Sequence, residues 1–246
     1  MIGTRVAVEV ATMADDRSFA AVLLDIDGTL LDSNDAHARA WVETLARHGR
    51  PVRFERVRAL IGKGGDKILA TLLGIGDEEP LGRRLSEDRR RLFLGRYLRS
   101  LRPTPGARPL LERMRADGLA LVVATSASGD ELAALLRQAG IDDLIASAAT
   151  SSDAARSKPD PDIVGVALNK SGVIAARALM LGDTPYDIEA ATRAGVATIA
   201  LRCGRGWDDA ALAGAIAIFD DPKALLAAWE RSPLARSASA QASPQG

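Results

Sequence analysis

Residues 20–32 have the sequence Ala-Ala-Val-Leu-Leu-Asp-Ile-Asp-Gly-Thr-Leu-Leu-Asp, and the rest of the chain is best interpreted outward from them. The stretch begins with a short, unbroken apolar run, which is typical of a strand buried on both faces of a parallel sheet. Two carboxylates follow, Asp25 and Asp27, and they project to the same side if the strand continues that far. Gly28 then allows the chain to turn where the sheet ends. Open α/β sheets bind ligands at the carboxyl ends of their strands, so the pair predicts a functional site there.

Composition narrows the class of protein. The 246 residues suffice for one sizeable core and a smaller module. Lys and Arg together number 32, as do Asp and Glu, so the charge gives no indication of nucleic-acid or membrane binding. The single Cys203 cannot form an internal disulfide, which favours a reducing, cytoplasmic compartment. No apolar run is long enough to span a bilayer. We expect residues 1–19 to form a disordered leader and residues 231–246 a disordered tail.

A helical insertion is expected between residues 34 and 102. The run Asp32-Ser-Asn is a helix start signal, and apolar residues then recur at helical spacing. The pattern predicts helices over residues 34–49, 54–61, 66–73 and 85–101, with no convincing strand among them. Pro103, Pro105 and Gly106 mark the end of the insertion. Residues 34–102 are therefore predicted to be a helical cap on an α/β core made of residues 20–33 and 103–230.

After residue 103, strand and helix patterns alternate, which predicts a mostly parallel sheet covered by helices. The predicted strands are 119–124, a weaker 144–147, 178–181, 196–201 and 215–219, and the predicted helices are 110–117, 131–139, 162–170, 188–194 and 223–229.

Three further segments place polar side chains at strand ends or turns. Thr125 and Ser126 follow an apolar strand and offer hydroxyl and backbone N–H groups to a phosphate oxygen, although a helix cap is the structural alternative. Lys158 precedes Pro-Asp-Pro, a rigid turn that fixes its direction, whereas an ordinary surface lysine would be solvated. Asp183 follows the strand 178–181 and Asp187 lies four residues later, beyond a proline that begins a helix. The structural alternative for this pair is that Asp183 only caps the helix and that Asp187 lies on the surface.

The acidic residues together indicate a metal site. Asp25, Asp27, Asp183 and Asp187 would repel one another in one cleft and raise one another's pKa values. A divalent cation removes this conflict, and ligands that are all oxygen, without His or Cys, favour Mg²⁺ over zinc. The cation and Lys158 together could hold the charge of a phosphoryl group during its transfer.

These four segments, in this order, resemble the motifs of the haloacid dehalogenase-like hydrolase superfamily over residues 20–230. The closest resemblance is to its Mg²⁺-dependent phosphatases with a helical cap, similar to phosphoglycolate phosphatase and β-phosphoglucomutase. It implies a Rossmann-like, doubly wound α/β core. The implied roles are nucleophile for Asp25, general acid and base for Asp27, phosphoryl contact for Thr125, charge neutralisation for Lys158, metal ligation for Asp183 and support of the site for Asp187.

The resemblance predicts hydrolysis of a small phosphomonoester in two steps. Asp25 attacks phosphorus while Asp27 protonates the leaving group, and Asp27 then deprotonates the water that releases phosphate. A phosphomutase of the same superfamily is the closest alternative. A dehalogenase of the same superfamily is another alternative. Its chemistry needs neither a leaving-group acid such as Asp27 nor a metal ligand such as Asp183, so the presence of these two residues argues against it. A non-enzymatic phospho-accepting signalling module would lack the large helical insertion, and an inactive binding protein would have no need of intact motifs.

The predicted cap is less informative. Ile61-Gly-Lys-Gly-Gly-Asp-Lys67 is a glycine-rich turn, so Lys63 and Gly64 are candidate substrate-binding residues, with a plain helix–helix turn as an equal alternative. The run Arg89-Arg-Arg91 could steer anionic substrates, but it is interpreted as a solvated helix face. The side chains assigned no functional role are His37 and His48, and those interpreted as packing residues are Trp41, Trp207 and Trp229.

Overall fold

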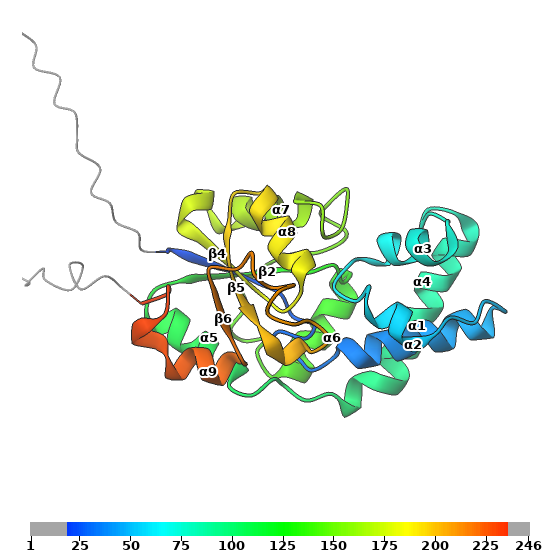
Figure 1. Cartoon of the computed structure of the whole chain (residues 1–246), viewed down its shortest axis with the longest axis horizontal. Helices are drawn as coiled ribbons and strands as arrows, with labels where there is room; N and C mark the ends of the chain where they lie inside the picture. Colours follow the sequence, from blue (N-terminus) through cyan, green and yellow to red (C-terminus); the bar gives the residue numbers. More distant parts are fainter. Residues whose placement is uncertain (1–18, 236–246) are drawn as a thin grey trace, which may run out of the picture.

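The computed structural model describes residues 19–235 (Figure 1). The expected disordered leader (residues 1–19) and tail (residues 231–246) lie mostly outside the described residues. Phe19 and Leu234, which are described, both pack against the core. Among the described residues, no helix is both long enough and apolar enough to cross a bilayer.

The core is a six-stranded sheet in which every pair of neighbours is parallel, in the order β3-β2-β1-β4-β5-β6. The strands are β1 (Ala21–Leu24), β2 (Ala120–Ala124), β3 (Ser147–Ala149), β4 (Ala178–Gly182), β5 (Ala197–Leu201) and β6 (Ala217–Phe219). The apolar run that opens residues 20–32 is thus the central strand, buried along its whole length. The predicted doubly wound, parallel α/β fold is confirmed.

Helices cover both faces of this sheet. Val22 and Leu24 of β1 belong to one buried cluster, whereas Leu23 between them belongs to another, as strand alternation requires. The first cluster includes residues of α5 (Ala107–Ala116), α6 (Gly129–Ala139) and α9 (Pro222–Ala227). The second includes residues of α7 (Asp162–Ser171) and α8 (Pro185–Arg193).

The cap consists of α1 (Asn34–Arg47), α2 (Phe54–Arg58), α3 (Gly65–Leu73) and α4 (Pro80–Leu92), which lie together beside the core (Figure 1). These helices share their own apolar cluster, in which Trp41 and Leu85 are buried. Two of their contacts reach the loops and helices that follow the strands. Arg58 donates to the carbonyl of Arg205 at 2.8 Å, and the Tyr186 hydroxyl donates to the carbonyl of Ala59 at 2.7 Å. The cap is therefore closed onto the carboxyl ends of the sheet.

Beyond differences of up to three residues at the ends of elements, two elements differ from the sequence predictions. The strand expected over residues 144–147 begins later, as β3 (Ser147–Ala149). Leu144 lies in a turn before it and is buried there, outside the sheet. The single helix expected over 85–101 begins at Pro80 and changes type after Leu92. It continues as a π-helical turn, Phe93–Tyr97, and then as a 3₁₀ turn, Leu98–Ser100.

Candidate active site

The register of the sheet brings the predicted strand ends together. Leu24, the last residue of β1, is paired with Val123 on one side and Leu181 on the other. Asp25 comes next, and its N–H donates to the carbonyl of Leu181 at 2.9 Å. Thr125 and Asp183 directly follow the neighbouring strands β2 and β4. Residues that are far apart in the sequence therefore lie at one edge of the sheet.

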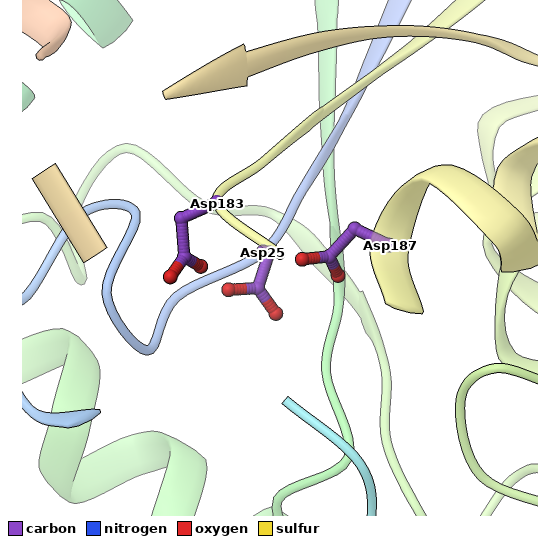
Figure 2. A group of neighbouring side chains, drawn as sticks. All are labelled: Asp25, Asp183 and Asp187. Carbon is purple, nitrogen blue, oxygen red and sulfur yellow. The ribbon is translucent and has the colours of Figure 1, made fainter. Parts of the chain in front are cut away.

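Three of the predicted acidic residues form a compact group. Asp25, Asp183 and Asp187 each present an oxygen, and these oxygens lie within 4.8 Å of one another. Figure 2 shows the three carboxylates side by side, reached from β1, from β4 and from α8. All three residues are buried. We call them the carboxylate cluster.

Neutral donors hold the carboxylate cluster in place. The Thr29 hydroxyl lies 3.1 Å from Asp25 Oδ2 and 3.0 Å from Asp183 Oδ1. Asn34, at the start of α1, donates from Nδ2 to Asp183 Oδ2 at 2.8 Å. At the N-terminus of α8, Asp187 Oδ2 accepts from the Thr184 hydroxyl at 2.7 Å and from the Thr184 N–H at 3.1 Å, and the N–H contact belongs to a capping box.

Lys158 places a positive charge against two members of the carboxylate cluster. Its Nζ lies 2.7 Å from Asp25 Oδ1 and 2.7 Å from Asp187 Oδ1, and the side chain is only 1% exposed. Although burial disfavours its charged form, these two carboxylates raise the pKa of Lys158 above its usual value. The lysine that the sequence placed before Pro-Asp-Pro is therefore aimed at the cluster and is not solvated.

The negative charge of the carboxylate cluster that Lys158 does not neutralise suits a divalent cation. Burial, together with the negative charges of Asp187 and Asp27, raises the pKa of Asp25 to about 7 despite Lys158. Burial and the charges of Asp25 and Asp187 raise the pKa of Asp183 well above its usual value. Three buried carboxylates facing one lysine leave excess negative charge, and a hard cation with oxygen ligands would neutralise it. The carboxylate cluster could therefore hold a metal ion.

Asp27 lies outside the carboxylate cluster. Strand β1 ends at Leu24, so the alternation that would place both acids on one side does not extend to Asp27. Its Oδ1 instead lies 2.5 Å from the Ser33 hydroxyl and 2.8 Å from His37 Nε2. Burial alone would raise the pKa of Asp27, but His37 and Ser33 hold it below its usual range. The Asp27 carboxylate, predicted as a metal ligand, is thus turned toward α1.

His37 belongs to a chain of polar contacts that continues into the cap. Its Nδ1 lies 3.3 Å from Arg89 Nη1, and Arg89 Nη1 is 2.6 Å from Glu131 Oε1. A guanidinium can only donate, so this contact is a hydrogen bond only when Nδ1 of His37 accepts. The His37 ring also stacks on Phe93, with centroids 3.9 Å apart. The interpretation of Arg89 as solvated was therefore wrong, because its side chain is 14% exposed and paired with Glu131. His37, which was assigned no functional role, contacts Asp27.

A cavity of about 60 Å³ lies over Asp25 and Asp27. We call it the inner cavity. The predicted substrate-binding residues Lys63, Gly64, Thr125 and Ser126 all line it, as do His37, Arg89 and the packing residue Trp41. The lysine and glycine come from the cap and the other two from the loop after β2, so both parts of the molecule form its wall. Lys158, which was also predicted to bind the substrate, does not line it, and neither do Asp183 and Asp187.

The predicted substrate-binding residues differ in how they are held. The Thr125 hydroxyl accepts from the N–H of Ala127 at 3.1 Å, a bond within the loop and not the helix cap weighed as its alternative, since α6 begins at Gly129 after Ser128. Within the described residues, Ser126 Oγ is buried without a hydrogen-bond partner. The N–H of Gly64 donates to Ser157 Oγ at 3.2 Å. Lys63 Nζ lies 4.7 Å from the ring centroid of Tyr186.

Comparison with known proteins identifies the family. A family model described as haloacid dehalogenase-like hydrolase matches residues 19–195. The chain belongs to this hydrolase family. It is 32% identical over 209 residues to a phosphoglycolate phosphatase of Rhodospirillum rubrum, covering 82% of this chain and 87% of the relative. It is 31% identical over 219 residues to an N-acetylmuramic acid 6-phosphate phosphatase of Pseudomonas aeruginosa, covering 86% and 95%.

A solved structure supports the same conclusion. The crystal structure of a hydrolase from Pseudomonas syringae superposes with a TM-score of 0.79 at 31% identity, covering 86% of this chain and 98% of that one. The prediction of an enzyme of the haloacid dehalogenase-like hydrolases is confirmed, and its homologues include phosphatases.

Sequence reasoning missed several residues of this hydrolase's site. Spacing offered one usable signal, since Ser33 precedes α1 and His37 follows four residues later, so both can face the same strand end. No comparable signal existed for Glu131, an apparently ordinary acid in the first turn of α6 whose side chain is only 3% exposed.

Proposed function

We propose that this hydrolase removes the phosphoryl group from a small phosphomonoester by transferring it first to Asp25 and then to water. The observation that carries the proposal is that Asp25 alone belongs both to the carboxylate cluster and to the wall of the inner cavity. A phosphoryl group in that cavity would meet this carboxylate first. The phosphatase names of the two relatives support the same chemistry.

Mg²⁺ is the cofactor we propose, held by Asp25 and Asp183 with Asp187 beside them. The donor set supports this choice, because the cluster offers only carboxylate oxygens. When bound, the ion supplies positive charge that offsets the negative charge of the phosphoryl group. Lys158 contributes a second positive charge, because its Nζ lies 2.7 Å from Asp25 Oδ1 and 2.7 Å from Asp187 Oδ1.

Asp27 is proposed to move the protons. In the first step Asp25 forms a bond to phosphorus, the bond to the ester oxygen breaks, and Asp27 donates a proton to that oxygen. In the second step Asp27 takes a proton from water, whose oxygen displaces the Asp25 carboxylate from phosphorus. The hydrogen bonds from Ser33 and His37 hold Asp27 for both transfers. A bound phosphoryl dianion would raise the pKa of Asp27, which favours the protonated form that the first step needs.

Release of phosphate from p-nitrophenyl phosphate tests the proposal. We expect turnover with Mg²⁺, none with a chelator, and none in Asp25→Asn. Asp32→Asn is the matched control, because Asp32 pairs with Arg205 on the surface at 3.0 Å and lines neither the cluster nor the cavity. Substantial activity in Asp25→Asn, or full activity in chelator, would rule the mechanism out. A sugar phosphate that is isomerised and not hydrolysed would instead identify a phosphomutase.

A further inference from the structure

The glycine-rich segment of the cap, residues 61–67, reaches from the cap to the core between α2 and the start of α3 (Figure 1). We call it the cap turn. Its Lys63 and Gly64 line the inner cavity, but other contacts of the turn are made with two loops of the core. One of these loops carries Lys158, and the other begins α8, which carries Asp187. The cap turn therefore meets both segments that hold this buried ion pair.

Ser157, the residue directly before Lys158, is bound by the cap turn. Its hydroxyl accepts from the N–H of Gly64 at 3.2 Å and donates to Asp66 Oδ1. Gly64 has a φ of −74°, which any residue adopts, so its backbone does not require glycine. A Cβ at this position would instead overlap the Ser157 side chain. The glycine is thus explained by the close approach of the cap turn to the loop of the lysine.

Two more contacts involve residues on either side of the ion pair. Lys67 Nζ lies 2.8 Å from Asp160 Oδ2, beyond the lysine in the same loop. Gly62 packs against Thr184, since a Cβ there would lie 2.8 Å from Thr184 Cγ2. The hydroxyl and N–H of Thr184 both donate to the Asp187 carboxylate. The cap turn therefore packs against the residue that orients the partner of the lysine.

The loop between these contacts is short and constrained. Only Lys158 and Pro159 separate Ser157 from Asp160, and the N–H of Asp160 donates to the carbonyl of Ser157 at 3.0 Å. A proline fixes φ, so the backbone of the lysine has little freedom to move independently of its two neighbours. A displacement of about 1 Å in a group that must be aligned for reaction can lower the rate about 10²-fold.

We infer that the cap turn positions Lys158: in the closed cap, Gly64, Asp66 and Lys67 hold the loop that directs the ammonium group at Asp25. The inference rests on the proposed phosphatase function, in which that ammonium group offsets the charge of the phosphoryl group. Since every phosphomonoester presents the same phosphoryl group, loss of these contacts should lower kcat by the same factor for all of them. A turn that only contacted the leaving group would affect different substrates differently.

Gly64→Ala tests the inference with p-nitrophenyl phosphate, phosphoglycolate and a hexose monophosphate. Because the added methyl group would displace the loop, kcat should fall about tenfold for all three substrates, with KM changed less than about threefold. In Ser157→Gly, which leaves room for the methyl group, adding Gly64→Ala should lower kcat no further. Gly95→Ala is the matched control, because a Cβ there meets nothing within 4 Å. A loss of kcat that differs more than about threefold among the substrates, or that is as large in Ser157→Gly, would overturn the inference.

Ser157→Ala tests whether the contact acts through the lysine. This variant removes one hydroxyl oxygen and adds no atom, so it also serves if Gly64→Ala fails to fold. We expect kcat to fall about threefold to fivefold in the wild-type background and to stay unchanged in the Lys158→Met background. An equal loss in both backgrounds would contradict the inference while the phosphatase function stands. If the wild type hydrolyses no phosphomonoester, the proposed function fails and this inference fails with it.

Discussion

Replacement of Lys158 by methionine probes the electrostatic balance of the site. Methionine has a similar length but no charge, so Lys158→Met leaves Asp25 and Asp187 without the ammonium group that lies 2.7 Å from each of them. Asp183, the third member of the carboxylate cluster, already lies within 4.8 Å of both. The variant should therefore be unstable wherever no other cation neutralises the cluster.

The expected loss of stability is large. Removing one partner of a buried ion pair typically costs about 3–5 kcal/mol, because the remaining charge stays buried without compensation. For a domain of this size, each kcal/mol shifts Tm by about 2–4 °C, so Tm should fall by about 6–20 °C in the absence of metal. Saturating Mg²⁺ should recover part of that loss, because the ion supplies positive charge to the same carboxylates. Turnover with Mg²⁺ should fall by about 10²–10³-fold.

Thermal unfolding followed by circular dichroism, in chelator and in excess Mg²⁺, measures both effects. Lys170→Met is the matched control, because Lys170 is 34% exposed and pairs with Asp153 at 3.1 Å on the surface. A surface pair of this kind contributes about 0–1 kcal/mol. If Lys158→Met unfolds in chelator within about 2 °C of the wild type, our account of the charge balance is refuted.

Three further predictions concern the neighbouring groups. His37→Phe keeps the stacking but removes the group whose charge and hydrogen bond lower the pKa of Asp27, so the alkaline limb of the kcat/KM profile against pH should move to higher pH. The pKa of Asp25 is raised from 3.8 to about 7, so its contribution to the stability of the metal-free fold is present below about pH 4 and is lost as the pH rises through about 7. Mg²⁺ should consequently raise Tm more at about pH 8 than at about pH 5. A methyl group at Gly204 would overlap the Asp183 carboxylate, so Gly204→Ala should weaken Mg²⁺ binding, measured by calorimetry, about 10- to 100-fold.

Each of these predictions has an outcome that contradicts it. A lower rate in His37→Phe with the same pH profile would mean that the histidine acts without changing the proton affinity of Asp27. An increase in Tm with Mg²⁺ that does not depend on pH would disagree with the raised pKa of Asp25. Gly165→Ala serves as the control for the glycine variant, because a Cβ at that helical position meets nothing within 4 Å.

Those parts of the fold and site that follow from local patterns were predictable. The apolar run ahead of Asp25 identified a buried parallel strand, and parallel strands place their carboxyl ends at one edge. That rule alone brings Asp25, Thr125 and Asp183 together. Lys158 was predictable for a different reason, since prolines constrain the backbone on its C-terminal side.

The remaining parts depend on how the cap packs against the core, which no local pattern encodes. Arg89 and Glu131 are ordinary surface residue types in amphipathic helices, and only the closed cap makes them partners at 2.6 Å. The direction of Asp27 was missed because two-residue alternation was extended beyond Leu24, where the strand already ends. Leu144 misled the strand assignment, because burial in a turn gives the same apolar signal as burial in a sheet.

Direct detection of the phosphorylated residue tests the central claim. Asp27→Asn should slow release of phosphate and let the acyl phosphate accumulate after rapid mixing with Mg²⁺ and p-nitrophenyl phosphate, because p-nitrophenolate leaves without the proton that Asp27 would donate. Borohydride reduces an aspartyl phosphate to homoserine, which peptide mass spectrometry locates in the sequence. We predict homoserine at position 25 only after exposure to substrate. Homoserine at any other position, or none while the first turnover releases p-nitrophenolate, would contradict transfer of the phosphoryl group to Asp25.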